Sequence, residues 1–156
     1  MMIVKDNVHY YVKQVLEEVL VKSFLLELDL EPKFGLVTKS SSGSHQDMSY
    51  EMMRSSVFTI VPYLIEMYEV GYSIDDLKVA FDRVRHIGKQ AEEAMLKNTK
   101  GINTYKGAIF LLGVILTSLG AFHQSKFSRD LINIIQKMTS NRSEERRVGK
   151  ECRSRW

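Results

Sequence analysis

Apolar and polar residues recur along most of this chain with the three- and four-residue spacing of amphipathic helices. In the first such segment, apolar side chains follow Asp6 or Asn7, either of which is suited to cap a helix. We predict that this helix ends near Leu28, and that His9, which lies off the apolar row, is solvated. The predicted inward side chains are Val8, Tyr11, Val12, Val15, Leu16, Val19 and Leu20.

Three further segments have the same pattern. The second helix is predicted to start after Asp47 or Ser49 and to stop at Gly71. The third starts with the variant capping box 73–76, and the last follows residues 127–130. The inward side chains are Tyr50, Met53, Val57, Ile60, Val61, Leu64 and Tyr68, then Leu77, Phe81, Val84, Ile87, Ala91, Ala94 and Met95, then Leu131, Ile134, Ile135 and Met138.

One segment, about residues 104–120, is apolar on every side and carries no charge after Lys106. Such a helix belongs in a protein core or in a membrane, and a span usually needs roughly 20 apolar residues. We therefore predict a central buried helix. Because no strand-like alternation occurs, the fold class is all-α, a compact multi-helix bundle around this helix and incomplete at its C-terminus.

The entrance of the central helix combines groups that suit a phosphate. Asn103 or Thr104 can cap the free amides, and Lys106 adds a cation where the helix dipole already favours an anion. Gly101 and Gly107 would let a ligand approach the backbone closely. The alternative is an ordinary capped core helix with a snorkelling lysine, which these residues alone favour.

The last 15 residues, 142–156, are charged and have no apolar periodicity. They resemble, codon for codon, the translation of a common DNA sequencing adapter. We therefore predict two parts: residues 1–141 as the N-terminal part of a single all-α catalytic domain, and 142–156 as an artefact outside the fold. The less favoured alternative is a natural basic tail that binds nucleic acid.

Removing the tail changes the charge of the chain. It holds six of the 22 Lys and Arg residues and three of the 19 Asp and Glu residues, so residues 1–141 carry 16 of each. A net charge of zero gives no support for a nucleic acid or an anionic membrane as partner. The only cysteine, Cys152, belongs to the tail, and no signal-peptide pattern starts the chain. We expect a cytoplasmic protein.

Three stretches carry a family resemblance. The stretch 101–113, Gly-Ile-Asn-Thr-Tyr-Lys-Gly-Ala-Ile-Phe-Leu-Leu-Gly, resembles the Gly-Val-Asn-Thr-His-Lys-Gly-Ala-Ile-Phe signature of the triphosphoribosyl-dephospho-CoA synthase family. The loop 32–48 is similar to that family's Pro-Lys-Pro-Gly-Leu-Val-Asp and Gly-Ala-His-x-Asp-Met-Asp segments. Glu92 fits its Ile-Gly-x-x-x-Glu-x-x-Met pattern. The resemblance covers residues 28–120.

This resemblance implies an all-α transferase. Members of the family join ATP to 3′-dephospho-CoA and release adenine, using Mg²⁺ to handle the triphosphate. The product, 2′-(5″-triphosphoribosyl)-3′-dephospho-CoA, is the precursor of the prosthetic group on the acyl carrier protein of citrate lyase or malonate decarboxylase. The expected partners are therefore ATP, 3′-dephospho-CoA and that carrier-protein pathway.

The resemblance also implies the candidate site residues. Asp47 and Glu92 are candidates to take the hydroxyl proton or to hold Mg²⁺, and His45 is a candidate to protonate adenine or contact a phosphate. The candidates for binding the nucleotide phosphates are Lys33, Gly35, Asn103, Thr104, Lys106 and Gly107.

Thr38, Ser49 and Tyr105 depart from the family, where two carboxylates and a histidine stand. Because family members are longer, we expect this chain by itself to be inactive. Two other functions remain open: a non-catalytic helical interaction module, and a Mg²⁺-dependent all-α nucleotide hydrolase. Adenine release that depends on dephospho-CoA would separate the transferase from both.

Overall fold

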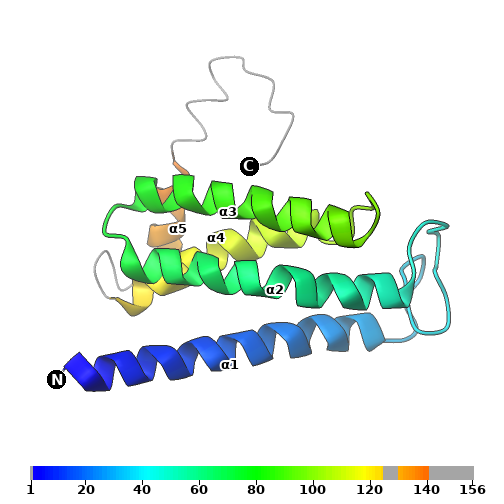
Figure 1. Cartoon of the computed structure of the whole chain (residues 1–156), viewed down its shortest axis with the longest axis horizontal. Coiled ribbons are helices and arrows are strands. Elements are labelled where there is room, and N and C mark those ends of the chain that lie inside the picture. The colour runs from blue at the N-terminus through cyan, green and yellow to red at the C-terminus, as the bar shows by residue number, and fades with distance from the viewer. Residues whose placement is uncertain (1, 125–129, 141–156) are drawn as a thin grey trace, which may run out of the picture.

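A computed structural model describes residues 2–124 and 130–140, and all secondary structure within them is helical. Helices α1 to α4 run antiparallel in chain order, and neighbours in sequence are neighbours in space (Figure 1). The prediction of an all-α fold is confirmed. The predicted tail and residues 127–129 lie outside the described residues. The helices are α1 (Met2–Asp29), α2 (Tyr50–Ser73), α3 (Leu77–Asn98), α4 (Lys106–His123) and α5 (Leu131–Thr139).

Short polar side chains begin three of the helices. The Ser49 hydroxyl accepts a hydrogen bond from the Met52 amide at 3.2 Å, as predicted for one of the two candidate caps. Asp76 and Asp130 cap α3 and α5 in the same way. The predicted capping box at 73–76 is therefore partly wrong: Ser73 ends α2, and Asp76 is itself the cap.

Gly71 does not stop α2, contrary to the prediction, because it is the contact point with α4. A Cβ atom built on Gly71 would lie 1.8 Å from the Thr117 carbonyl oxygen, and one on Gly120 would lie 2.1 Å from the Tyr68 carbonyl oxygen. The two backbones therefore touch with no side chain between them. Glycine is required here by this close approach and not by a turn.

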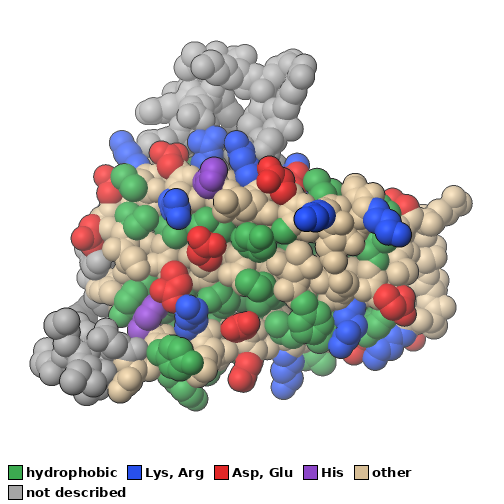
Figure 2. All heavy atoms as spheres, in the orientation of Figure 1, with side chains coloured by type: hydrophobic (Ala, Val, Ile, Leu, Met, Phe, Trp, Pro, Cys, Tyr) green, Lys and Arg blue, Asp and Glu red, His purple; other side chains and the backbone are tan. Residues whose placement is uncertain are grey.

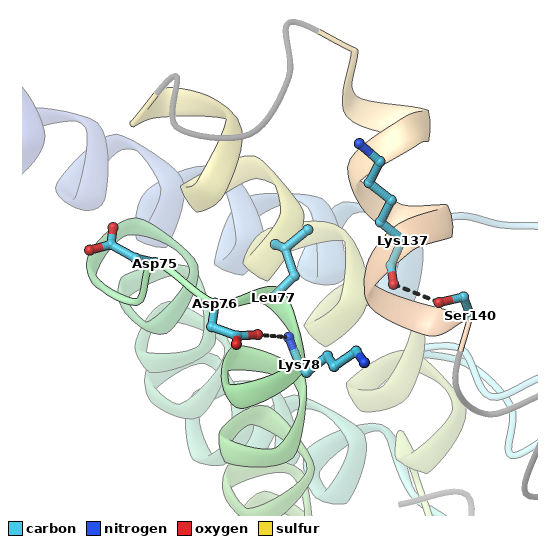
Figure 3. A pocket seen from close by; sticks show the side chains of 6 residues that line it. All are labelled: Asp75, Asp76, Leu77, Lys78, Lys137 and Ser140. Atoms are coloured by element: carbon cyan, nitrogen blue, oxygen red, sulfur yellow. Dashed lines mark hydrogen bonds between the residues drawn. The ribbon is translucent and has the colours of Figure 1, made fainter.

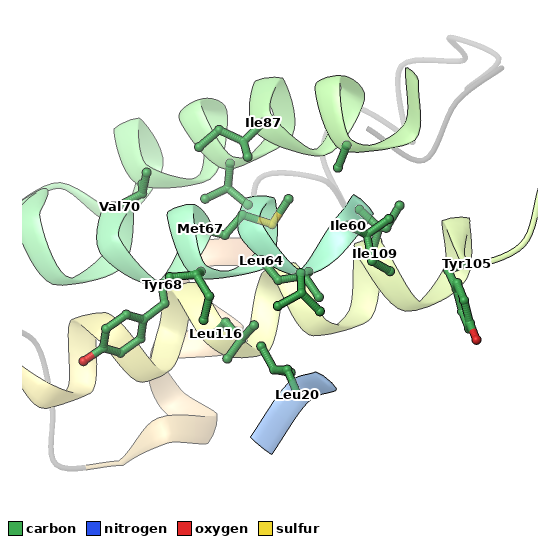
Figure 4. Packing of buried hydrophobic residues seen from close by; sticks show 14 of the residues in the cluster. Leu20, Ile60, Leu64, Met67, Tyr68, Val70, Ile87, Tyr105, Ile109 and Leu116 are labelled. Carbon is green, nitrogen blue, oxygen red and sulfur yellow. The ribbon is translucent and has the colours of Figure 1, made fainter. Parts of the chain in front are cut away.

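The core lies between α2, α3 and α4 (Figure 4). Most of the predicted inward side chains of α2, α3 and α5 are buried or half-buried, as their spacing predicted. α4 packs against α2, α3 and α5, which confirms its central place, although Leu111 is 59% exposed. Among the described helices, α4 alone is long and apolar enough to span a membrane, and its packing inside the bundle identifies it as a core helix.

α1 packs mainly against α2, and Phe24 also contacts Tyr105 just before α4, which corrects the prediction for the inward face of α1. The helix begins at Met2, ahead of the predicted cap at 6 or 7, and only one row of its apolar side chains is covered. His9 is half-buried and pairs with Glu69 at 2.9 Å, so it is not the solvated residue that was predicted. Val12, Leu16 and Leu20 face the core, whereas Val8, Tyr11, Val15 and Val19 are exposed.

Acidic and basic side chains occur side by side over the face of the bundle shown in Figure 2. This distribution agrees with the balanced charge of residues 1–141. Long-range attraction to a polyanion requires a continuous area of positive charge. The visible face offers mixed charges instead.

Candidate active site

Every segment that carries a predicted site residue lies at one end of the bundle. The loop after α1, the start of α2, the last turns of α3 and the start of α4 all lie at this end (Figure 1). Tyr50 on α2 donates to Asp29 on α1 at 2.6 Å, and Ser55 on α2 bonds to Asn98 on α3. The antiparallel order of the helices thus places residues far apart in sequence at a common end.

Lys106 and Glu92 meet at the junction of α3 and α4. The Lys106 ammonium donates to Glu92 Oε1 at 2.5 Å, and the two side chains are 28% and 18% exposed. A charge-assisted hydrogen bond of this kind is stronger when it is partly removed from water. The sequence predicted both residues for the site, and the structure brings them into direct contact.

The turn before α4 is fixed by side chains as well as by its backbone. Asn103 Oδ1 accepts from the Lys106 amide at 3.1 Å, which confirms Asn103 as a capping side chain. The buried Thr99 hydroxyl lies within hydrogen-bond distance of the Met95 carbonyl at 2.9 Å and of the Ile102 carbonyl at 2.5 Å, which links the end of α3 to this turn. Thr104 does not cap the helix: its Oγ1 is buried and has no partner among the described residues. Gly107 lies exposed in the first turn of α4.

Tyr105, the residue just before α4, is held inside the bundle. It is 8% exposed, and its ring meets Phe24 on α1 edge to face at 5.1 Å between centroids. Burial, with a smaller effect from the Glu27 charge, raises the pKa of the Tyr105 phenol well above its usual value. Its hydroxyl has no partner among the described residues, and the side chain is therefore a neutral packing group.

Lys33, predicted to bind phosphate, caps the end of α1 in this structure. Its ammonium donates to the Glu27 carbonyl at 2.8 Å and to the Glu27 carboxylate at 3.2 Å, and the side chain is 8% exposed. A cation is favourable there because the C-terminal carbonyls of a helix lack partners. No hydrogen bond or ion pair of the described residues links Lys33 to Lys106 or Glu92.

The loop that follows α1 is closed by a backbone contact. Gly35 has φ +74°, and its carbonyl accepts from the Ser44 amide at 3.1 Å. A Cβ atom on Gly43 would lie 2.6 Å from the Gly35 carbonyl carbon, so the two glycine-containing segments of the loop cross with their backbones in close contact. This crossing presents His45 half-buried and Asp47 exposed beside it, with no side-chain hydrogen bond from either among the described residues.

Within the described residues, the carboxylates are not gathered into a site for a resident metal ion. No group of three His, Cys, Asp or Glu side chains within residues 2–124 and 130–140 is arranged to hold a metal. Mg²⁺ commonly uses only one or two carboxylates and completes its shell with water and substrate phosphates. Glu92 is one such carboxylate, and in this structure it is paired with Lys106.

Two supporting residues were missed by the sequence reasoning. Glu27 accepts from Lys33 and acts on the pKa of Tyr105, and Thr99 secures the turn before α4. The sequence spacing of Glu27 does not distinguish it from the other charged residues of α1, so it could not be selected from the sequence. Thr99 precedes a Lys-Gly pair at a helix end, and that context favours a capping role.

A separate open hollow lies at the opposite end of the bundle, between the start of α3 and the end of α5 (Figure 3). It contains none of the residues predicted for the site. Its shallow lining comes from both charged and apolar groups. The lining residues are Asp75, Asp76, Leu77, Lys78, Lys137 and Ser140.

Comparisons with known proteins identify the family of this chain. Residues 13–152 match the model of one protein family, described as ATP:dephospho-CoA triphosphoribosyl transferase. A probable 2-(5″-triphosphoribosyl)-3′-dephosphocoenzyme-A synthase from Lactiplantibacillus plantarum is 38% identical over 120 residues, which is 76% of this chain and 42% of that protein.

Two further proteins are similar to this chain over a comparable length. The 2-(5″-triphosphoribosyl)-3′-dephosphocoenzyme-A synthase of Haemophilus ducreyi is 33% identical over 80% of this chain and 39% of its own length. Protein CitXG of Leuconostoc mesenteroides subsp. cremoris is 38% identical over 78% of this chain and 26% of its own length. The chain therefore spans about two fifths or less of these relatives. No solved structure matches it significantly.

Proposed function

Since this chain belongs to the ATP:dephospho-CoA triphosphoribosyl transferase family, we propose that it carries the part of the enzyme that binds the triphosphate of ATP. The enzyme joins ATP to 3′-dephospho-CoA and releases adenine. Its product is the prosthetic-group precursor for the acyl carrier protein of citrate lyase or malonate decarboxylase. The observation that carries this proposal is the Lys106–Glu92 pair, which lies where the family signature forms the entrance of α4.

The entrance of α4 supplies what a polyphosphate needs. Asn103 caps the Lys106 amide, but the positive end of the α4 dipole and the Lys106 ammonium both favour an anion, and exposed Gly107 leaves room for it. Lys106 is 28% exposed, so a phosphate can reach it from solvent. When bound with ATP, Mg²⁺ would offset the charge of the triphosphate beside Glu92 and Asp47.

The reaction exchanges one bond to the ribose. The 2′-hydroxyl oxygen of dephospho-CoA forms a bond to C1 of the ATP ribose while the bond from that carbon to adenine breaks. The hydroxyl proton passes to a carboxylate, for which Glu92 and Asp47 are the candidates, and the departing adenine takes a proton, for which His45 is the candidate. A carboxylate near C1 also stabilises the positive charge that develops on the ribose.

The test follows adenine release from ATP by chromatography, with and without 3′-dephospho-CoA. It is run on this chain and on the chain joined to the remaining part of the Lactiplantibacillus plantarum relative. Adenine that appears only when both substrates are present supports the transferase. Hydrolysis of ATP without dephospho-CoA identifies a nucleotide hydrolase, and no reaction from either form rejects the proposal.

A further inference from the structure

The Lys106–Glu92 pair places an anion next to the cation that the proposed function assigns to the triphosphate. Glu92 Oε1 lies 2.5 Å from the Lys106 ammonium, and within the described part of the chain this is the only ion pair of Lys106. The other candidate lysine, Lys33, is occupied by the carbonyl groups at the end of α1. The main cation of the site is therefore neutralised before any ligand arrives.

An anion that binds to Lys106 meets the negative charge of Glu92 at short range. A lysine ammonium has three N–H donors, so a phosphate oxygen can share it with Glu92. The two anions then lie within roughly 6 Å of each other, in a partly desolvated place where charge repulsion is stronger than in water. Such a repulsion weakens anion binding by at least about tenfold.

A divalent cation removes this conflict. Carboxylate and phosphate oxygens are the ligands that Mg²⁺ prefers, and it commonly joins one carboxylate to the phosphates of a nucleotide. Because Glu92 is partly exposed, its side chain can turn from Lys106 toward solvent without unfolding α3. The lysine is then free to contact the triphosphate.

We infer that Glu92 holds Lys106 in the absence of substrate and makes triphosphate binding depend on Mg²⁺. This inference rests on the proposed function. It assigns Glu92 a role in discrimination: metal-free ATP is rejected by the carboxylate, and the magnesium complex of ATP is accepted. A purely structural salt bridge would give no such difference between the two forms of the nucleotide.

The test measures the affinity of the 156-residue chain for ATP by isothermal titration calorimetry, once with excess Mg²⁺ and once with EDTA. The decisive variant is Glu92→Gln, which keeps the shape and an oxygen acceptor for Lys106 but removes the charge. We expect it to bind metal-free ATP about tenfold more tightly than the wild type and to lose most of the gain from Mg²⁺. Thermal melting by circular dichroism establishes that the variant is folded.

Glu93→Gln is the matched control, because Glu93 is the exposed neighbour on the same helix. It should change neither affinity by more than about twofold. If the wild type binds no ATP even with Mg²⁺, the proposed function itself is rejected. If the wild type binds the magnesium complex, but Glu92→Gln binds metal-free ATP no more tightly than the wild type, the inference alone is overturned.

Discussion

The ring of Tyr105 packs edge to face against the ring of Phe24 at 5.1 Å, and this contact fixes the entrance of α4 against α1. The phenol hydroxyl gains nothing from the contact, because it is buried without a hydrogen-bond partner among the described residues. An unsatisfied buried hydroxyl destabilises the folded state. The aromatic ring and the hydroxyl of Tyr105 therefore have opposite effects on stability.

Tyr105→Phe should consequently raise the free energy of unfolding, by about 1 kcal/mol, since it removes the unsatisfied hydroxyl and keeps the ring. Urea unfolding followed by circular dichroism measures the change. Tyr50→Phe is the control, because the Tyr50 hydroxyl donates to Asp29 at 2.6 Å and its loss should lower stability slightly. A destabilised Tyr105→Phe would mean that the hydroxyl has a partner in solution.

Lys106→Ala should weaken binding of the magnesium complex of ATP roughly ten- to hundredfold, because charge-assisted contacts to phosphate contribute about 1.5 to 3 kcal/mol. Binding of 3′-dephospho-CoA, measured separately by calorimetry, should change far less. Lys89→Ala, an exposed lysine on α3, serves as the control. Equal losses for both substrates would assign Lys106 a structural role.

Gly71→Ala should lower the free energy of unfolding by about 3 kcal/mol or more, because its methyl group would overlap the Thr117 carbonyl oxygen. Gly107→Ala is the comparison for stability, since Gly107 is an exposed helical residue where alanine is favoured by roughly 1 kcal/mol. Denaturant unfolding of both variants gives the two values. Similar stabilities for the two would show that α2 and α4 separate easily at this point.

His123 should make stability depend on pH. Its Nδ1 shares a hydrogen bond with the Tyr68 hydroxyl at 2.9 Å, and burial, followed by the nearby charge of His9, lowers its pKa below the ordinary 6.5. The unfolded chain therefore binds more protons than the folded one as pH falls through 6.5, and the stabilisation present above that pH is lost below it. The unfolding free energy of wild type and His123→Asn, compared at pH 7.5 and pH 5, should differ less at pH 5.

Deleting residues 142–156 should leave the melting temperature unchanged, since this segment has no apolar periodicity with which to pack. Differential scanning calorimetry of the full chain and of residues 1–141 makes the comparison. A loss of several degrees in the shorter form would assign the segment to the fold.

Helix position and type were readable from the sequence because periodic apolar spacing and capping side chains are local properties. Ser49, Asp76 and Asp130 cap their helices through groups within three residues of each other. The predictions were wrong where a residue distant in sequence determines the conformation or the exposure of a position. Gly71 looks like a helix stop until α4 is placed against it, and His9 looks solvated until Glu69 is brought alongside.

In the candidate site, too, local features could be predicted from the sequence, whereas contacts between distant segments could not. Asn103 is one of the two caps that the sequence offered, and the structure confirms it. Lys106 and Glu92 were each predicted for the site, but their direct contact was not predicted, because it depends on how α3 and α4 pack. The contact of Lys33 with α1 depends on the path of a loop, which no periodicity encodes. The phosphate roles of Lys33 and Lys106 and the chemical roles of Asp47, Glu92 and His45 stay predictions.

The backbone contact of Gly120 with α2 is a point about which a small rotation of α4 would displace the distant start of the helix. Lys106 lies 14 residues before Gly120, so the distance along α4 from the contact to the proposed phosphate-binding entrance is about 21 Å. Turning this part of α4 by about 3° displaces Lys106 by about 1 Å, and an error of that size can cost a hundredfold in rate. A small rotation of α4 caused by a side chain added at Gly120 would therefore become a larger displacement at Lys106. The rate of the proposed reaction would then fall because of a change at a residue that never contacts the substrate.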